Sequence, residues 1–392
     1  MDETLYRMRN NGEIKTWRIW TEQDGNEWKI FSESASSETA KKTKTHKGTV
    51  ATEADAEKKA QSMMKKSAYD KGYQKSRDDA INKPLFLPML AHATKSKNEG
   101  EMFDRKILDN LPYPVYFQRK FDGIRGIATV LSDGSVRFTS RSLNETPAPI
   151  PHIKQEIANL KIPDGVFLDG ELYVHGSDAD FDTAKGWINT EEKSDSYAEH
   201  ERETPNHQDL IKYRIYDFFD PSQPDLTYEE RYELLEQWLD PNSKNLVLTK
   251  NYTVNNFDEM FELGSRFHYD EGYEGGIIRI LGVPYKQGAK SKSTMLKFKF
   301  FRDEEFEIVG FKDGDTPASK GLIIFKCWSP EAEKRGKNPL FDVKPNGTDE
   351  QRRKWFEEGE KFIGSDLTVE FEEYSKDGIP KKPTGKSIRT YD

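Results

Sequence analysis

The pattern of hydrophobic and polar positions predicts a small α+β unit at the start of the chain. Short alternating runs, separated by Asn/Gly and Asp/Gly turn signals, indicate an antiparallel meander. These runs are Leu5–Met8, Thr16–Trp20 and Trp28–Phe31. A loop rich in Ser, Thr and Lys is expected over Ser34–Gly48. Thr52 and Asp55 have the spacing of a capping box, which predicts a helix from there to about Ala68.

The pattern changes twice further along the chain. Residues 84–302 alternate strand-like and helix-like segments, which is typical of a mixed α/β domain. Within them, Glu191–Asp209 is almost uniformly charged and polar, so we expect a surface excursion without a chemical role. Over residues 303–392, short β runs surround one helix-like insert at Asp349–Phe362, which predicts a compact β-barrel of OB type. The sequence thus predicts three domains, the first of them covering residues 1–83.

Composition places the chain among soluble, folded proteins. Hydrophobic residues make up 34% of its 392 positions, charged residues 33% and aromatic residues 12%. The single cysteine, Cys327, excludes internal disulfides, iron–sulfur clusters and multi-cysteine zinc sites, and it fits a reducing compartment. The first residues carry no apolar signal core, and no apolar run is long enough to span a membrane. We therefore expect an intracellular, cytoplasmic protein.

The net charge of −9 argues at first against a nucleic-acid partner, because proteins that bind phosphates usually carry a basic surplus. The charge is unevenly distributed, however. Residues 1–83 contain 17 Lys and Arg against 14 Asp and Glu, whereas the remaining residues contain 43 against 55. A local basic surface is therefore compatible with the acidic total.

Residues 120–126, Lys-Phe-Asp-Gly-Ile-Arg-Gly, place a lysine beside a turn. Residues 113–117 have the pattern of a strand and Asp122-Gly123 is a strong turn signal, so Lys120 would project from a strand end. A lysine amine attacks phosphorus or a carbonyl carbon only when deprotonated, and burial or nearby cations lower its pKa toward that state. Taken alone, such a motif more often marks a solvated turn lysine.

Three further segments carry side chains suited to a nucleotide. Asp169 and Glu171 alternate along a predicted strand and share one face, as ribose or metal ligands would, although a strand end entering a turn is about as typical of this pattern. Tyr216 lies in a buried-strand pattern, where a ring belongs more often to the core but could stack on a flat base. Glu274 precedes a double glycine, where backbone could approach a ligand closely, and its carboxylate would suit Mg²⁺.

Lys297 and Lys299 share one face of a predicted strand, and apolar side chains occupy the other face. Two cations on the side of a cleft would bind phosphates and lower the pKa of Lys120. An ordinary edge strand with its lysines in water is the more common case for such a hexapeptide.

As an ordered set, these segments resemble the nucleotidyltransferase motifs of ATP-dependent DNA ligases, most closely those of phage type. The motifs are Lys120-Phe-Asp-Gly-Ile-Arg, Phe167-Leu-Asp-Gly-Glu-Leu, Tyr213-x-x-Tyr216-Asp217, Glu274-Gly-Gly-Ile-Ile-Arg279 and Leu296-Lys-Phe-Lys299. Pro88-Met89-Leu90-Ala91 is similar to the opening of the ligase adenylation domain. Pro383 and Ile388-Arg389 are similar to the final motif of its OB domain. The resemblance covers about residues 86–392 and implies a nucleotidyltransferase domain followed by an OB-fold domain.

The resemblance implies a three-step reaction. Lys120 would attack the α-phosphate of ATP, expel pyrophosphate and hold AMP as a phosphoramidate. AMP would then pass to the 5′-phosphate of a nick, and the neighbouring 3′-OH would displace it and seal the strand. Such chemistry depends on positioning and on neutralising charge. The implied cofactors are ATP and Mg²⁺, with Mn²⁺ as a substitute, and the implied partner of this monomeric enzyme is nicked duplex DNA.

The other motif residues receive roles from the same resemblance. Glu171 would contact the ribose, Tyr216 would stack on adenine, and Glu274 would help to place Mg²⁺, with Asp169 as a second carboxylate. Cations would handle the phosphates: Lys297 and Lys299 at the α-phosphate, Arg125 and Arg141 at AMP and the nick 5′-phosphate, and Arg389 at pyrophosphate.

Two positions depart from the ligase pattern. Gln118 stands where many DNA ligases carry an acid that reads the adenine amino group, and an amide selects ATP over GTP less strictly because it both accepts and donates hydrogen bonds. Lys381 stands where an arginine is common, and a lysine lacks the bidentate geometry of a guanidinium.

Several rival functions share parts of this pattern. An RNA ligase, another polynucleotide ligase or an mRNA-capping guanylyltransferase uses the same lysyl-nucleotide chemistry, but Asp122 and Arg125 resemble DNA ligases more. From a different class, a non-catalytic DNA-end-binding protein would share the architecture, although every expected catalytic position here is filled. Residues 1–83 resemble a WGR-type DNA-binding module, chiefly through the aromatic meander and the run Ala56–Tyr73; a stability appendage or protein-docking module is the alternative.

Overall fold

The computed structural model describes residues 1–8, 13–70, 73–82, 86–96, 101–131, 133–141, 145, 150–174, 186–188, 210–288, 290–316 and 319–389. The chain divides into two compact units. The first comprises Met1–Ala93, Asp109–Gly264 and Gly276–Lys297, and the second comprises Thr94–Leu108, Ser265–Gly275 and Phe298–Asp392. The division into domains at residues 83 and 302 stays a prediction. The expected polar excursion, Glu191–Asp209, lies entirely outside the described residues.

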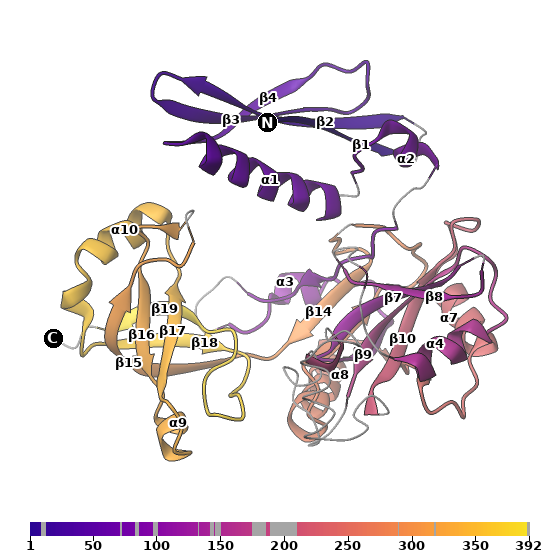
Figure 1. Cartoon of the computed structure of the whole chain (residues 1–392). Helices are drawn as coiled ribbons and strands as arrows, with labels where there is room; N and C mark the ends of the chain where they lie inside the picture. Colours follow the sequence, from indigo (N-terminus) through magenta and orange to yellow (C-terminus); the bar gives the residue numbers. More distant parts are fainter. Residues whose placement is uncertain are drawn as a thin grey trace. The chain divides into compact units, whose positions relative to one another are not determined.

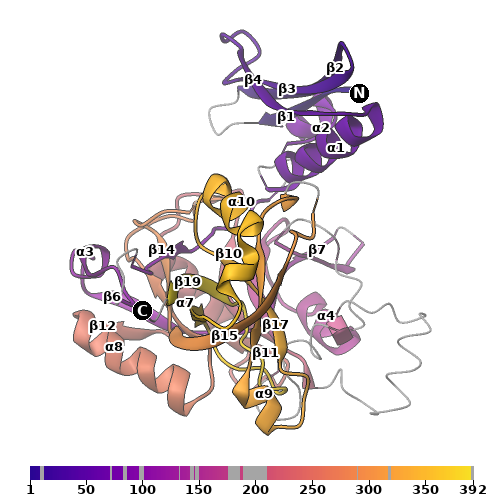
Figure 2. The ribbon, with the colours of Figure 1, turned by 90° about the vertical axis from the view of Figure 1, so that its left-hand side faces the viewer.

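The four-stranded sheet at the start of the chain confirms the predicted antiparallel meander. Its strands pair in sequence order and are β1 (Asp2–Met8), β2 (Ile14–Asp24), β3 (Glu27–Ala35) and β4 (Thr43–Val50). Helix α1 (Glu53–Asp70) lies along one face of this sheet, as Figures 1 and 2 both show, and α2 (Arg77–Asn82) follows it. The backbone N–H of Asp55 donates to Oγ1 of Thr52 at 3.2 Å, so the predicted helix start is confirmed.

Strand β4 corrects one expectation. The segment Ser34–Gly48 was expected to be a loop, but β3 extends to Ala35 and β4 begins at Thr43. Strand β4 is an edge strand whose side chains are mostly exposed, so backbone pairing with β3 defines it, and no hydrophobic alternation marks it in the sequence.

A five-stranded sheet with the order β11-β10-β9-β7-β8 forms the first half of the α/β region. Its strands are β7 (Ile124–Val130), β8 (Val136–Thr139), β9 (Phe167–Tyr173), β10 (Lys212–Phe219) and β11 (Leu246–Leu248). Helices α4 (Pro151–Ala158) and α7 (Tyr228–Trp238) contribute Ile153, Ile157 and Leu235 to the same buried core as Leu168 and Tyr213. A capping box between Thr227 and Glu230 starts α7.

A second five-stranded sheet has the order β12-β6-β13-β14-β5. Its strands are β5 (His92–Ala93), β6 (Val115–Lys120), β12 (Tyr252–Val254), β13 (Gly275–Arg279) and β14 (Met295–Lys299). Along the chain, α3 (Arg105–Leu108) lies between β5 and β6, and α8 (Phe257–Ser265) and the π-helix η2 (Arg266–Asp270) lie between β12 and β13. Met89, Ile127, Phe219 and Met295 belong to one buried cluster, which joins residues of both sheets.

The C-terminal segment forms a closed barrel, as the short β runs predict. Its strands follow the order β15-β16-β17-β19-β18, and β17 alternates exposed and buried residues as a barrel wall requires. They are β15 (Arg302–Lys312), β16 (Ile324–Trp328), β17 (Leu340–Pro345), β18 (Asp366–Phe371) and β19 (Thr384–Arg389), with α9 (Pro330–Lys334), α10 (Asp349–Glu357) and the 3₁₀-helix η4 (Gly359–Phe362) between strands. Cys327 lies fully buried in the barrel core beside Phe341 and Val343.

Candidate active site

Lys120 is the last residue of β6, which confirms its predicted place at a strand end. The turn that follows leads into β7 and passes close to β9. A Cβ atom at Gly123 would lie 2.5 Å from the carbonyl oxygen of Leu172 and 2.8 Å from Cγ of Glu171. Only a glycine fits there, so the turn that carries Lys120 is held directly against Glu171.

Glu171 and Tyr216 lie side by side on neighbouring strands. The hydroxyl of Tyr216 donates to Oε2 of Glu171 at 3.4 Å. The guanidinium carbons of Arg125 and Arg279 lie 5.8 and 5.4 Å from the centroid of the Tyr216 ring. Burial raises the pKa of Tyr216 well above its usual value, so this hydroxyl stays protonated and remains a donor. The structure thus brings together the two residues predicted to hold the ribose and the base.

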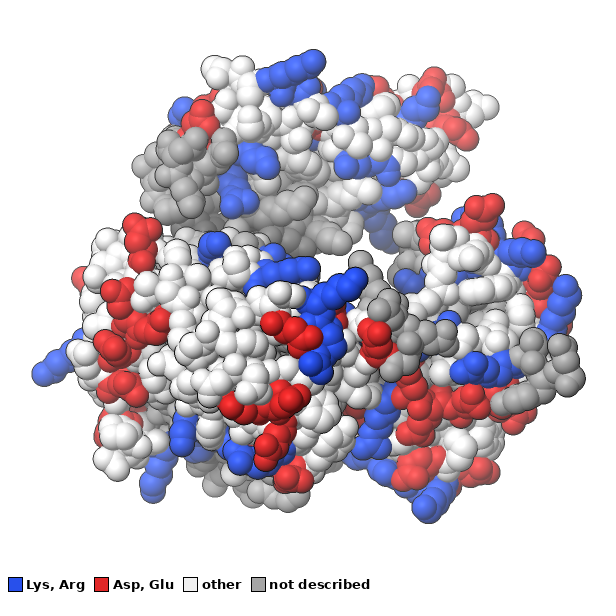
Figure 3. All heavy atoms as spheres, turned by 180° about the vertical axis from the view of Figure 1, so that it is seen from behind, with Lys and Arg blue, Asp and Glu red and all other residues white. Residues whose placement is uncertain are grey.

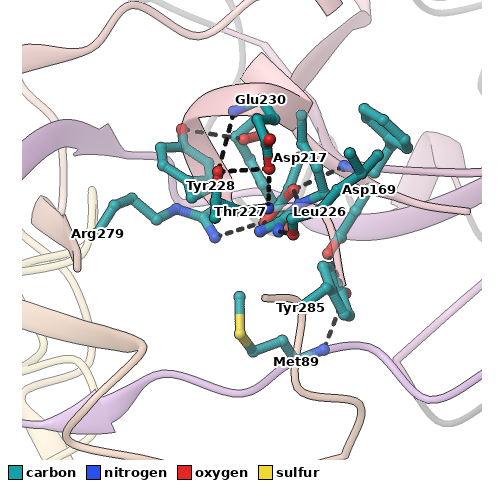
Figure 4. Close-up of polar contacts among 12 residues, drawn as sticks. Met89, Asp169, Asp217, Leu226, Thr227, Tyr228, Glu230, Arg279 and Tyr285 are labelled. Atoms are coloured by element: carbon teal, nitrogen blue, oxygen red, sulfur yellow. Dashed lines mark hydrogen bonds and ion pairs between the residues drawn. The ribbon is translucent and has the colours of Figure 1, made fainter. Parts of the chain in front are cut away.

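Asp169 shares a face of β9 with Glu171, as predicted, and its carboxylate pairs with Arg125. Its carboxylate is 1% exposed and accepts two hydrogen bonds from Arg125, at 2.8 and 2.5 Å. The hydroxyl of Tyr285 donates to Oδ2 at 2.6 Å and accepts from the backbone N–H of Met89, as Figure 4 shows. Both oxygens of Asp169 are thus engaged by side chains, and its predicted role as a metal ligand stays a prediction.

Arg125 is held by this arrangement. Burial alone would lower its pKa, but the charge of Asp169 and the neighbouring tyrosines raise that pKa well above its usual value, so the guanidinium stays charged. Its second terminal nitrogen donates to the carbonyl oxygen of Met89 at 2.7 Å. The contact of Arg125 with AMP and the nick phosphate stays a prediction, and the fixed guanidinium limits how far it could reach.

A network that we call the buried arginine cluster lies beside Tyr216 and consists of Gln118, Asp217, Arg231 and Arg279. Asp217 is fully buried; it accepts hydrogen bonds from Arg231 at 2.7 and 3.2 Å and from Arg279 at 2.9 Å. Figure 4 shows Arg279 reaching toward Asp217, with Tyr228 next to it. Asp217 and Arg279 stood in the ligase-like motifs without a role, and Arg231 carried no sequence signal at all.

Gln118 lies inside this cluster. Its side chain is 1% exposed and makes three hydrogen bonds there. Oε1 accepts from Nε of Arg279 at 3.1 Å, and Nε2 donates to the hydroxyl of Tyr228 at 2.9 Å and to the carbonyl oxygen of Thr249 at 3.4 Å. Both amide hydrogens of Gln118 are thus engaged, while Oε1 keeps one lone pair, so the reading of the adenine amino group by Gln118 stays a prediction.

A second charged group, which we call the lysine–glutamate cluster, consists of Glu274, Lys299, Glu372 and Lys382. Lys299 forms ion pairs with Glu274 and, at 2.6 Å, with Glu372; Lys382 pairs with Glu372 at 2.8 Å and with Glu274 at 3.6 Å. Lys299 and Glu274 are 11% and 9% exposed. The side chain expected at the α-phosphate and the one expected at Mg²⁺ are therefore adjacent.

The double glycine after Glu274 serves packing. A Cβ atom at Gly276 would lie 1.9 Å from the ring of Phe117, and one at Gly275, whose φ is +133°, would lie 2.3 Å from the carbonyl oxygen of Phe298. These glycines let β13 lie against its neighbours. Close packing of the strands therefore explains why glycine is required at both positions, whereas the sequence had suggested close approach of a ligand.

Three further side chains were predicted to bind phosphates: Lys297, Arg141 and Arg389. Lys297 is on β14, two residues before Lys299. Arg141 is exposed in the turn after β8. Arg389 ends β19, and its Nε donates to Glu305 and to Thr368 at 3.2 and 3.1 Å. Their phosphate contacts stay predictions.

A metal ion would need carboxylates, histidines or cysteines that lie close together. Among the residues that the structure describes, no group of three or more His, Cys, Asp or Glu could hold a metal ion. Mg²⁺, however, is usually held by one or two carboxylates together with substrate phosphates and water, so Glu274 fits this mode of binding.

The comparison with known proteins decides the family. Residues 88–299, more than half of the chain, match the model of the ATP dependent DNA ligase domain. The chain belongs to the ATP-dependent DNA ligases. It is therefore an enzyme that uses ATP to join DNA strands at nicks, and the rival RNA-ligase and non-catalytic readings are not favoured. No helix in the described ranges is long and apolar enough to cross a membrane.

Viral and phage DNA ligases are among the relatives of this ligase. The DNA ligase of African swine fever virus (Pretoriuskop isolate) is 27% identical over 337 residues, covering 82% of this chain and 73% of the viral protein. The DNA ligase of enterobacteria phage T4 is 27% identical over 266 residues, covering 57% of this chain and 52% of that protein.

Solved structures support the same fold. A Lig E DNA ligase is 16% identical with a TM-score of 0.57, covering 78% of this chain and all of that one. The structure named Pmar-Lig_PreS3 is 19% identical with a TM-score of 0.61, covering 80% of this chain and 72% of that one. The α/β region and the barrel of this ligase are thus a nucleotidyltransferase domain and an OB-fold.

Proposed function

We propose that Lys120 is the nucleophile of this ligase. Its Nζ would attack the α-phosphorus of ATP, forming a P–N bond as the bond to pyrophosphate breaks. AMP would then move to the 5′-phosphate of a nick, and attack by the 3′-OH would release AMP. The observation that carries this assignment is Gly123, which holds the turn after Lys120 against Glu171, itself hydrogen-bonded to Tyr216.

The same geometry supports a nucleotide held by neighbouring strands. Glu171 would accept from a ribose hydroxyl, and Tyr216 would stack on adenine, which is worth about 1–3 kcal/mol per base. Lys297 and Lys299 would neutralise the α-phosphate. Glu274 would hold Mg²⁺ together with phosphate oxygens and water, and the ion would supply charge neutralisation during phosphoryl transfer.

DNA would be bound as a nicked duplex by a monomer acting inside the cell. Arg141, exposed after β8, would contact the 5′-phosphate at the nick. Arg389 on the barrel would orient pyrophosphate in the first step. Basic and acidic side chains are interspersed on the face shown in Figure 3, so phosphate contacts would depend on particular side chains rather than on a uniformly basic surface.

The four-stranded module would be a WGR-like domain that contacts DNA. The sheet face opposite its core cluster carries Trp20 and Phe31, whose rings stack at 5.6 Å, with Nζ of Lys44 at 4.9 and 4.0 Å from their centroids. Lys44→Glu in the full chain should weaken binding of a nicked duplex and flatten its salt dependence, measured by fluorescence anisotropy. Lys29→Glu, which alters a lysine paired with Asp24, is the matched control. Equal binding by both variants and the parent would favour a docking or stability role.

The central experiment detects the covalent intermediate. Purified protein is incubated with Mg²⁺ and α-labelled ATP or GTP, denatured, and tested for protein-bound label that survives base and is released by acid, as a phosphoramidate requires. We expect label from ATP, none from Lys120→Ala, and transfer of the label to nicked duplex DNA. Persistent label on Lys120→Ala would refute the assignment of the nucleophile, and label from GTP alone would indicate capping chemistry.

A further inference from the structure

The two arginines of the buried arginine cluster are similar in burial and share one carboxylate. Arg231 and Arg279 are each 2% exposed, and both donate to Asp217. Arg231 comes from helix α7 and pairs with Asp217 through two nitrogens; its third contact is the carbonyl oxygen of Leu226 at 2.6 Å. By position alone, both could be simple core ion pairs.

Of these two arginines, Arg279 also contacts Tyr216, the ring that Arg125 approaches as well. Its guanidinium carbon lies 5.4 Å from the centroid of the Tyr216 ring and 4.8 Å from that of Tyr228. Among the ring contacts of Arg231 are Tyr228, at 5.6 Å, and Tyr285, at 5.5 Å. A guanidinium over an aromatic face is attracted by the ring, and more strongly when both are removed from water.

The guanidinium of Arg279 is fixed from two sides. One terminal nitrogen donates to Oδ2 of Asp217 at 2.9 Å, and Nε donates to Oε1 of Gln118 at 3.1 Å. The amide of Gln118 is itself held by Tyr228 and the backbone of Thr249. A planar fork gripped at two nitrogens has little freedom, so it can hold a neighbouring ring in one orientation.

We propose that Arg279 is a positioning residue for ATP: gripped by Asp217 and Gln118, it fixes the plane of the Tyr216 ring on which the adenine stacks. This inference rests on the proposed stacking role of Tyr216. Gln118 then acts on the base indirectly, through Arg279. Because the Tyr216 ring is already held in one orientation, ATP binding loses less side-chain entropy. The arrangement therefore favours ATP binding and leaves the phosphoryl-transfer step unchanged.

The test compares Arg279→Lys with Arg231→Lys in the full-length protein. Single-turnover formation of protein-bound AMP is measured over a range of ATP concentrations, alongside thermal unfolding. We expect Arg279→Lys to raise the half-saturating ATP concentration about tenfold with the maximal rate within about twofold of the parent. Arg231→Lys should lower the melting temperature at least as much, yet change the half-saturating concentration by less than about twofold.

Gln118→Leu provides a second arm because it removes the acceptor for Nε of Arg279 without touching the guanidinium. It should raise the half-saturating ATP concentration about threefold, and it decides the matter if Arg279→Lys does not fold. Equal shifts in the Arg279 and Arg231 variants, or no shift in Gln118→Leu, would reduce the cluster to a structural role and overturn the proposal.

Tyr216→Ala distinguishes the stacking role of Tyr216 from the positioning role of Arg279. If it weakens ATP saturation while the Arg279 and Gln118 variants do not, the positioning role fails and the stacking role stands. If Tyr216→Ala leaves ATP saturation unchanged, the stacking role fails and the positioning role fails with it.

Discussion

The buried arginine cluster and the lysine–glutamate cluster differ in burial, in composition and in whether a phosphate can replace a carboxylate as the partner of a cation. The first sets two guanidiniums on Asp217, and all three side chains are 2% exposed or less. The second sets two ammonium groups among two carboxylates, and exposure rises to 60% at Lys382. A compact ammonium near water can trade a carboxylate for a phosphate, whereas a guanidinium fork fixed in the core cannot.

The difference shows two ways in which ion pairs support one reaction. Breaking a buried pair leaves a charge without compensation, so such pairs hold geometry. Pairs with an exposed member contribute less to stability, and Lys382 is 60% exposed, so the lysine–glutamate cluster can open more easily when a substrate arrives. In this ligase the first kind lies beside the ring proposed to stack on adenine, and the second kind contains Lys299, proposed to bind the α-phosphate.

The largest expected effect concerns Asp217→Asn. The substitution keeps an acceptor oxygen but removes the carboxylate that Arg231 and Arg279 share, so it should lower the free energy of unfolding by about 3–5 kcal/mol. Urea unfolding followed by circular dichroism measures this loss. Glu373→Gln, which alters a partly exposed pair with Lys381, is the control and should cost less than about 1 kcal/mol. Similar losses in both would mean that the buried pairs of Asp217 hold the fold no more firmly than a partly exposed pair.

A smaller effect is expected for Glu372→Gln. It removes one of the two carboxylates on Lys299 and should lower the half-saturating ATP concentration about two- to fivefold in protein–AMP formation, because ATP then displaces a weaker competitor. Because Glu274 still pairs with Lys299, the loss of unfolding free energy should be smaller than for Asp217→Asn. Its sequence neighbour Glu373 again supplies the control. Weaker ATP saturation in Glu372→Gln would mean that this carboxylate supports Lys299 rather than competing for it.

The smallest effect is a pH dependence at Asp220, three residues after Asp217. Burial raises its pKa, but hydrogen bonds from Ser222 and Gln223 outweigh burial and lower the pKa below 3.8. A lowered folded-state pKa gives stability that is present above 3.8 and is lost as pH falls through the folded value. Asp220→Asn should thus cost about 1 kcal/mol at pH 7, and the cost should shrink in acid. A difference that stayed constant from pH 7 to pH 3 would contradict this origin.

Strand periodicity carried the sequence predictions furthest. Side chains two apart on a strand share a face whatever surrounds them, which is why the pairing of faces at Asp169 and Glu171 could be predicted. Lys120 at a strand end and the start of α1 at Thr52 follow from equally local signals. By contrast, β4 is an edge strand without hydrophobic alternation, so its residues looked like a loop.

Contacts between residues far apart in the chain could not be predicted from the sequence. Gln118 meets Arg279 across 161 positions and Arg125 meets Asp169 across 44, and no local pattern in the sequence could predict either contact. The double glycine at positions 275 and 276 gave a signal that was real but ambiguous, because close approach of a strand and close approach of a ligand require the same residue.

The buried thiol of the barrel has a practical consequence for experiments on this ligase. Cys327 is the only cysteine in the sequence; it is fully buried, and burial raises its pKa to about 12, so at neutral pH it is protonated and shielded from reagents. A cysteine introduced on the surface would therefore be the single reactive thiol, and dyes or spin labels could be attached there with no change to the native residue.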